Sequence, residues 1–106
     1  MNAIPRTLAI TVANGTGTGT FNAFRLNSVG FGVVPPAVVA PAPLANYSID
    51  FTDPDGFGVA GRADCNGVVV VRDRFQCWDI LTVTISLASI AGVYNVKLWC
   101  VQSDGD

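Results

Sequence analysis

The chain has 106 residues, which suits one domain (residues 1–106), and 50% of them are hydrophobic while only 13% are charged. A typical soluble domain carries about 25% charged residues, so either Thr, Ser, Asn and Gly form much of the surface or a partner covers part of it, and we favour assembly. The formal net charge of −2 with scattered basic residues argues against nucleic-acid binding, and no apolar stretch is long enough for a membrane-spanning helix.

The first half of the chain shows a hydrophobic period of two, which indicates half-buried strands. The alternation begins at residues 7–13. Residues 14–21 (NGTGTGTF) are predicted to form a loop between two strands, because a phosphate-binding loop needs a following Lys and a helix, and the sequence offers neither. Between residues 21 and 33 the apolar positions change from even to odd numbers, which predicts a bulge or tight turn near Asn27 and Ser28.

The middle of the chain is divided by turn-forming residues. Residues 35–45 (PPAVVAPAPLA) are predicted to be an extended connection outside any sheet, because proline cannot donate to a strand ladder. A strand with Tyr47, Ile49 and Phe51 on its apolar face follows, and it ends at a predicted DPDG turn, residues 53–56. A second turn is expected at CNG, residues 65–67.

The segment 68–83 (VVVVRDRFQCWDILTV) admits two interpretations. In the first, two strands are joined by a turn in which Arg72, Asp73 and Arg74 are solvated. In the second, the charged part is a contact loop, because Arg, Phe75 and Trp78 are residue types enriched at protein interfaces. The sequence alone does not decide between these two interpretations.

The last two strands have the clearest alternation. SIAG (residues 89–92) is predicted to join them as a hairpin, and Trp99 falls opposite the apolar side of its strand, which favours a covered surface. The residues expected on the apolar faces are Leu81, Val83, Ile85 and Leu87 in the first strand and Tyr94, Val96, Leu98 and Cys100 in the second. With about seven or eight short strands and no helical stripe, the sequence predicts an all-β fold, namely an antiparallel, jelly-roll-like β-sandwich.

The side chains that usually carry catalysis or bind metals are scarce. The chain has no His, the commonest general base near neutral pH, so we expect no enzyme, no cofactor and no metal site. Asp53 and Asp55 faintly resemble part of a calcium loop, but the chain has no Glu to complete one, and a turn is favoured.

The N-terminus has no secretory signal, which predicts synthesis in a reducing, intracellular compartment. The cysteines do not have the spacing of a zinc site. We therefore expect them to be reduced, mostly buried apolar groups, with a single disulfide as the alternative. They are Cys65, Cys77 and Cys100.

Two segments resemble parts of small virion proteins of tailed bacteriophages. They are residues 46–62 (NYSIDFTDPDGFGVAGR) and 79–101 (DILTVTISLASIAGVYNVKLWCV). The residues that carry the resemblance are Tyr47, Phe51, Asp53, Asp55 and Gly56, then residues 82–85, and Gly92, Tyr94, Val96, Lys97 and Leu98. The resemblance implies a head decoration or cement protein that is made in the host cytoplasm and sits in the virion. It also implies a jelly-roll-like sandwich, often trimeric, that binds capsid subunits.

The sequence therefore predicts a structural protein that binds other virion subunits through apolar and aromatic surface. The expected contact residues are Phe75, Trp78, Val38, Val39 and Leu44, with Arg72 and Arg74 at the rim. The alternative hypothesis is a carbohydrate- or ligand-binding β-sandwich module whose site contains Trp78, Trp99 and the Asp53–Asp55 turn.

Overall fold

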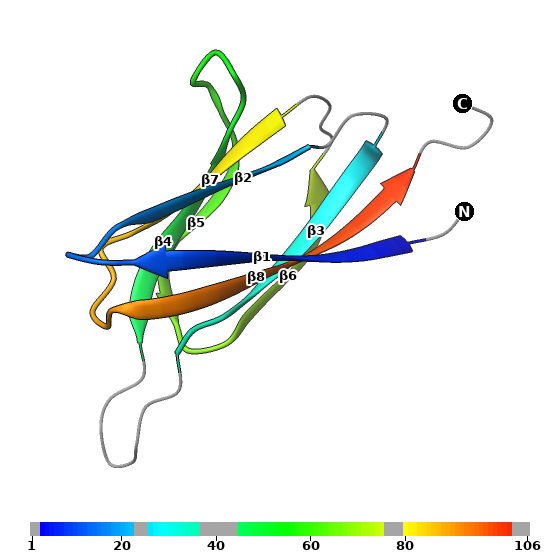
Figure 1. Ribbon diagram of the computed structural model, residues 1–106. Helices are drawn as coiled ribbons and strands as arrows, with labels where there is room; N and C mark the ends of the chain where they lie inside the picture. Colours follow the sequence, from blue (N-terminus) through cyan, green and yellow to red (C-terminus); the bar gives the residue numbers. More distant parts are fainter. Residues whose placement is uncertain (1–2, 23–25, 37–44, 76–79, 103–106) are drawn as a thin grey trace.

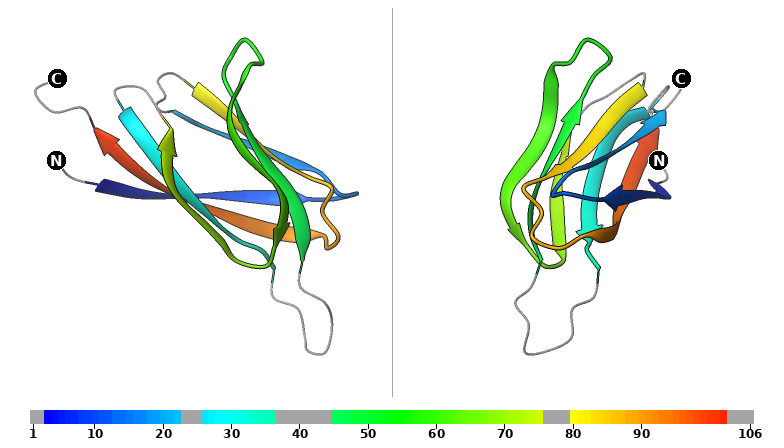
Figure 2. Two further views of the ribbon diagram at one scale, coloured as in Figure 1. Left: turned by 180° about the vertical axis from the view of Figure 1, so that it is seen from behind. Right: turned by 60° about the vertical axis from the view of Figure 1, so that its left-hand side comes forward.

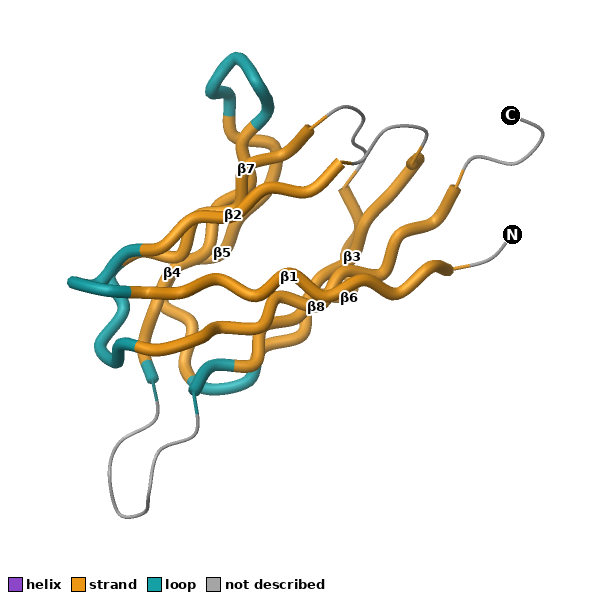
Figure 3. Tube along the Cα trace, in the orientation of Figure 1, coloured by secondary structure: helices purple, strands orange, loops and turns teal. Residues whose placement is uncertain are grey.

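Eight antiparallel strands form two four-stranded sheets that pack face to face (Figures 1 and 2). The computed structural model describes residues 3–22, 26–36, 45–75 and 80–102, with side chains described for residues 6–22, 30–36, 45–71 and 80–99. No helix occurs in these residues, so none of them forms a helix that could cross a membrane (Figure 3). The all-β prediction is confirmed.

The order of the strands identifies the architecture. One sheet has the order β1-β8-β3-β6 and the other β2-β7-β4-β5, which interleaves the two halves of the chain in the manner of a jelly roll. The bounds are β1 Ala3–Val12, β2 Gly17–Asn22, β3 Leu26–Val34, β4 Asn46–Thr52, β5 Gly58–Asn66, β6 Val69–Phe75, β7 Ile80–Ser86 and β8 Gly92–Gln102.

The core lies between the two sheets and is built from the alternating apolar residues. Buried side chains come from both sheets and are Ile10, Val12, Phe21, Phe31, Val33, Ala45, Tyr47, Ile49, Phe51, Cys65, Leu81, Val83, Ile85, Tyr94, Val96 and Leu98. The rings of Tyr47 and Tyr94 meet edge to face, with centroids 5.4 Å apart. Their hydroxyls donate hydrogen bonds to the carbonyl oxygens of Gly67 (2.6 Å) and Ile90 (2.7 Å), which satisfies both buried polar groups.

The bulge predicted in the first half of the chain is confirmed. Leu26 of β3 pairs with Gln102 of β8, whereas Ser28 pairs with Val101, so two residues of β3 stand against one of β8. The extra residue, Asn27, changes which positions of β3 face the core. This places Phe31 and Val33 inside the sandwich.

The loop predicted for residues 14–21 is wrong for most of its length. Only Asn14 and Gly15 form the turn, both with positive φ (55° and 84°), and Gly17 already begins β2. The glycines serve packing instead. A Cβ on Gly17 would lie 2.4 Å from the carbonyl oxygen of Thr11, so β1 and β2 can approach this closely only with glycine at that position.

The predicted hairpin at residues 89–92 is also wrong, because β7 and β8 belong to different sheets. The connection crosses from one sheet to the other and is anchored to its neighbours on the way. Ala88 N–H donates to the carbonyl of Gly15 (3.1 Å), and Ser89 N–H donates to that of Asn46 (2.9 Å). Leu87, expected on the apolar face, lies after β7 with φ of 52° and is 81% exposed.

The turn or loop predicted at Arg72, Asp73 and Arg74 is wrong as well, whereas the contact role proposed for the segment stays a prediction. Arg72 to Arg74 continue strand β6, which ends at Phe75. The four valines before them have a high strand propensity, and β6 is held on one side by β3. The charged residues therefore lie along the edge strand of the β1-β8-β3-β6 sheet.

We expect Gly17→Ala to lower the free energy of unfolding by about 1–3 kcal/mol, because the added methyl group overpacks the contact with β1. Gly58→Ala is the matched control, since a Cβ there meets no atom within 4 Å. It should change stability by less than about 0.5 kcal/mol. Urea unfolding of both variants measures the difference, and equal stabilities would contradict the close approach of β1 and β2.

Stability should fall as the pH rises above about 10. Burial raises the pKa of Tyr47 and of Tyr94 above the ordinary value of 10.0, so the unfolded chain loses these protons first. The stabilisation is complete below the unfolded pKa and is lost as the pH rises towards the folded pKa. Urea unfolding between about pH 8 and pH 11 measures the loss. Tyr47→Phe should flatten the decline, and an unchanged slope in this variant would contradict the assignment.

Candidate interaction surface

The outer face of the β2-β7-β4-β5 sheet is covered by hydroxyl groups. Thr20 and Thr52 both pair with Thr82 of β7, and Thr18 pairs with Thr84. The remaining outward side chains of β4 and β7 are also polar over most of the sheet, for example Ser48. Over β4 and β7 this face carries one charged side chain, Asp50, and its hydroxyl groups explain part of the low charge content of the chain.

The outer face of the other sheet, β1-β8-β3-β6, has a different composition. Its described side chains are small, apolar or neutral except for one cation, Lys97. They are Thr7, Ala9, Thr11, Val34, Val70, Val93, Asn95, Lys97 and Trp99. Val70 and Val93 are 51% and 46% exposed. We call this set the outer sheet face, and among the described surfaces it most resembles the apolar centre of a protein interface.

Trp99 is partly covered by its own chain. Its indole ring lies over Gly32 of the neighbouring strand β3, where a Cβ would approach the ring to 3.0 Å. Gly30, opposite Trp99 in the ladder, is buried too. Because Gly30 and Gly32 have no side chains, the indole ring of Trp99 can pack against the backbone of β3. This contact partly buries the ring on the outside of the sheet within a single chain.

The predicted contact residues fall partly on this sheet. Phe75, Arg72 and Arg74 lie on β6, at its edge, although their side chains are not among those described. Val38, Val39, Leu44 and Trp78 lie outside the described residues. Their role in contacts therefore stays a prediction.

The site of the alternative, ligand-binding hypothesis is not assembled. Trp99 lies on the outer sheet face, whereas Asp53 and Asp55 lie in the turn between β4 and β5, which belong to the other sheet. The third member, Trp78, is outside the described residues. The described parts of that site are thus on different sheets.

The predicted turn at residues 53–56 is confirmed, and its geometry shows what Asp53 does. One carboxylate oxygen, Oδ1, accepts hydrogen bonds from the backbone N–H of Asp55 (3.0 Å) and of Phe57 (2.9 Å). Asp53 N–H donates to the carbonyl of Phe57 (2.9 Å), and Gly56 N–H donates to that of Asp53 (3.0 Å). Asp53 therefore holds the turn together. Among the described residues, no group of three or more potential metal ligands lies close enough to bind an ion.

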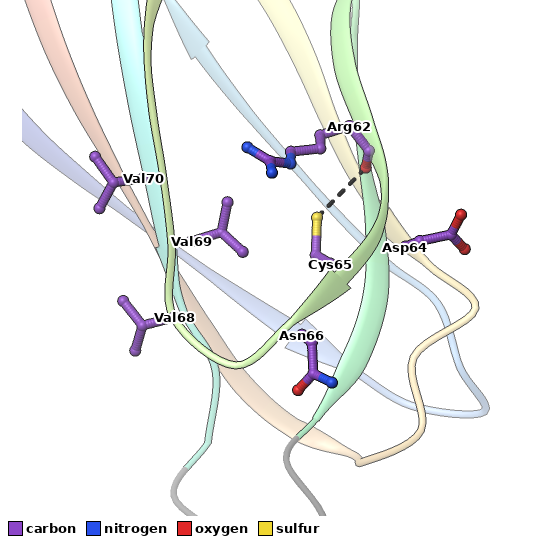
Figure 4. A pocket seen from close by; sticks show the side chains of 7 residues that line it. All are labelled: Arg62, Asp64, Cys65, Asn66, Val68, Val69 and Val70. Carbon is purple, nitrogen blue, oxygen red and sulfur yellow. Dashed lines mark hydrogen bonds between the residues drawn. The ribbon is translucent and has the colours of Figure 1, made fainter.

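A hollow lies between β5 and β6, where the two sheets part (Figure 4). It has a volume of about 370 Å³ and is lined by Arg62, Asp64, Cys65, Asn66, Val68, Val69 and Val70. The turn expected at residues 65–67 is confirmed only at Gly67, which has φ of 66°, because Cys65 and Asn66 still belong to β5. Sequence reasoning missed the hollow, because it forms only when β5 and β6 are assigned to opposite sheets.

Cys65 is buried beside this hollow as a free thiol, as expected from the sequence. Its Sγ donates to the carbonyl oxygen of Arg62 at 3.5 Å. Burial raises the pKa of the thiol, and the positive charge of Arg62 only partly opposes this. The thiolate is therefore disfavoured, and Cys65 acts as a small core residue. The side chains of the other two cysteines are not described.

No protein-family model and no curated protein sequence matches the chain. Among solved structures, it is similar to a structure of infectious bursal disease virus, Gx strain, over 97% of its length, with 15% sequence identity and a TM-score of 0.37. The VP2 subviral particle of infectious bursal disease virus is similar over 95%, with 13% identity and a TM-score of 0.35. This chain spans 34% of the length of each of those chains. The fold assignment rests on the strand order described above.

Gly32→Ala should displace the ring of Trp99, because the added methyl group would stand 3.0 Å from the ring and also 3.0 Å from the carbonyl oxygen of Val69. In a Trp78→Phe background Trp99 is the remaining tryptophan. Adding Gly32→Ala to this background should shift the fluorescence emission of Trp99 to the red and increase its quenching by acrylamide, because the displaced ring is more exposed. Gly58→Ala in the same background is the control. An unchanged spectrum in the Gly32 variant would show that the ring does not pack against Gly32.

Proposed function

We propose that this chain is a structural protein of a virus particle, and more specifically a head decoration or cement protein of a tailed bacteriophage. In this proposal it binds capsid subunits by burying surface, without a cofactor and without catalysis. The observation that carries the proposal is the outer sheet face, which is nearly uncharged in its described part and presents Val70, Val93 and Ala9 to solvent.

Three features support the proposal. The jelly roll is an architecture of viral capsid domains, although lectin domains and cupins also use it, so the fold counts only as analogy. The low charge content of the chain is accounted for on one sheet by hydroxyl groups, but on the other sheet by small and apolar side chains. Two segments also resemble small phage virion proteins, and both contribute strands of the sandwich, namely β4 and β5 and then β7 and β8.

The outer sheet face is the capsid-binding surface in this proposal. Its centre is formed by β8 and β3, which are held on both sides by other strands and cannot shift on binding. Arg72 and Arg74, on the edge strand β6, lie where the rim of the interface is expected. Interfaces of this kind bury about 1,600 Å² in total, and the symmetry of a capsid repeats each contact many times.

The test begins with the solution mass of the purified chain, measured by light scattering over a concentration series. It continues with cosedimentation of the chain with empty capsids of the phage that encodes it. Ala9→Asp and Val93→Asp should each weaken capsid binding by about tenfold or more, because a carboxylate would be buried without a partner. Thr18→Asp, on the outer face of the other sheet, is the matched control.

Three outcomes separate the possibilities. Capsid binding that is lost in the two outer-face variants and kept in the control supports the proposal. Binding that is equally weakened by Thr18→Asp would move the capsid-binding surface to the other sheet. A chain that does not sediment with capsids under any condition would overturn the decoration role.

A further inference from the structure

The hairpin of β4 and β5 ends in an exposed aromatic side chain. The backbone of this hairpin projects beyond the ends of the neighbouring strands (Figures 1 and 2). Phe57, directly after the turn, is 70% exposed. A Cβ on either neighbour, Gly56 or Gly58, would meet no atom within 4 Å, so the backbone on both sides of Phe57 is open to solvent. Nothing in the described fold uses this ring.

The hairpin tip is rigid, which distinguishes it from an ordinary exposed loop. The four hydrogen bonds around Asp53 tie its backbone and its carboxylate to Asp55, Gly56 and Phe57. A backbone held in this way loses little further conformational entropy when a partner binds the tip. Aromatic residues are also the commonest anchors of protein interfaces. The tip thus has the features of an anchor, and Asp55 is exposed in the same turn.

A candidate receptor for this ring lies along the second half of the same strand, β5. The hollow between β5 and β6 has the size of a small ligand pocket, about 370 Å³. In Figure 4 Arg62 and Val69 point towards each other across it, while the carboxylate of Asp64 points away. Arg62 is exposed on β5. The lining of the hollow therefore combines three valines with one cation, Arg62, and one anion, Asp64, whose carboxylate is turned away from it.

We propose that Phe57 of one copy inserts into this hollow of a second copy, with Asp55 facing Arg62. The ring would cover Val69 and the stem of Arg62, and the carboxylate of Asp55 would face the guanidinium group of Arg62. The occupant is another copy of the chain because the two surfaces are complementary in both size and charge. The hollow shares only Val70 with the outer sheet face, and this proposal does not depend on the virion role.

The tip and the hollow cannot meet within one copy. Phe57 precedes β5, whereas the hollow begins at Arg62 in the middle of that strand, five residues or about 17 Å further along. Each copy would therefore bind one neighbour through its tip and another through its hollow. Such a head-to-tail contact forms a ring if the rotation between copies closes and an open chain if it does not.

The first experiment is sedimentation velocity of the full chain over a concentration series. We expect the wild type to associate and Phe57→Ser to weaken the association by about tenfold or more. Leu87→Ser is the matched control, because Leu87 is 81% exposed but belongs to neither surface. A wild-type chain that stays monomeric throughout the series would overturn the proposal. Equal association of all three proteins would overturn it too.

A charge exchange tests whether the tip and the hollow are the two halves of one contact. Asp55→Arg and Arg62→Asp should each weaken association, and the two changes in one chain should restore it. Mixing the Phe57→Ser variant with the Arg62→Asp variant should give one-to-one dimers only, because the first keeps its hollow and the second keeps its tip. Failure of both the rescue and the dimer would overturn the pairing, even if Phe57→Ser alone were defective.

These results are separable from those on capsid binding. Ala9→Asp and Val93→Asp change the outer sheet face and should leave head-to-tail association unchanged. Phe57→Ser should leave the binding of a single copy to a capsid unchanged. If Phe57→Ser abolished capsid binding and wild-type chains did not associate with each other, the partner of the tip would be a capsid subunit, and the proposal of a second copy would be wrong.

Discussion

The apolar layer between the two sheets is the interaction on which the rest of the structure depends. Only β4 and β5 are consecutive strands that pair with each other; every other connection between consecutive strands crosses from one sheet to the other. Hydrogen bonding within local hairpins therefore cannot assemble this fold. Burial of the side chains between the sheets brings the distant partners together, and the hydroxyls of Tyr47 and Tyr94 add direction to a contact that is otherwise non-directional.

The two sides of this layer are closed differently. On one side β1 and β2 approach each other closely because Gly17 and Gly19 leave room for the side chains and backbone of β1. Arg6 extends this closure by donating from Nη1 to the carbonyl of Asn22 (3.3 Å). On the other side β5 and β6 remain apart, and the hollow beside Arg62 is the result. The hollow proposed as a receptor thus exists because the two sheets are in close contact at β1 and β2 but not at β5 and β6.

Period-two alternation predicted the strands and the core well, because each inward residue of a sandwich strand meets the same apolar layer. It located the bulge of β3 from the change of phase alone. The errors concern information that alternation does not carry. Glycines in β2 look like a loop until β1 is placed against them, Leu87 looks buried until the chain leaves the sheet at Ser86, and residues 89–92 look like a hairpin until β7 and β8 separate. The hollow likewise depends on topology, whereas Trp99 was correctly singled out by its position opposite the apolar face.

The pairing of β1 with β8 has a consequence for how the protein is made. Ala3 lies opposite Val101 in the ladder, and β8 is an inner strand of its sheet. A nascent chain therefore cannot complete that sheet until the residues of β8 have left the ribosome, and until then β1 and β3 lack the strand that joins them. Folding of such non-local topologies is slow and leaves edges exposed. Truncated products lacking β8 would be left without half of the sandwich, so only chains that have passed this point present the surfaces proposed here for assembly.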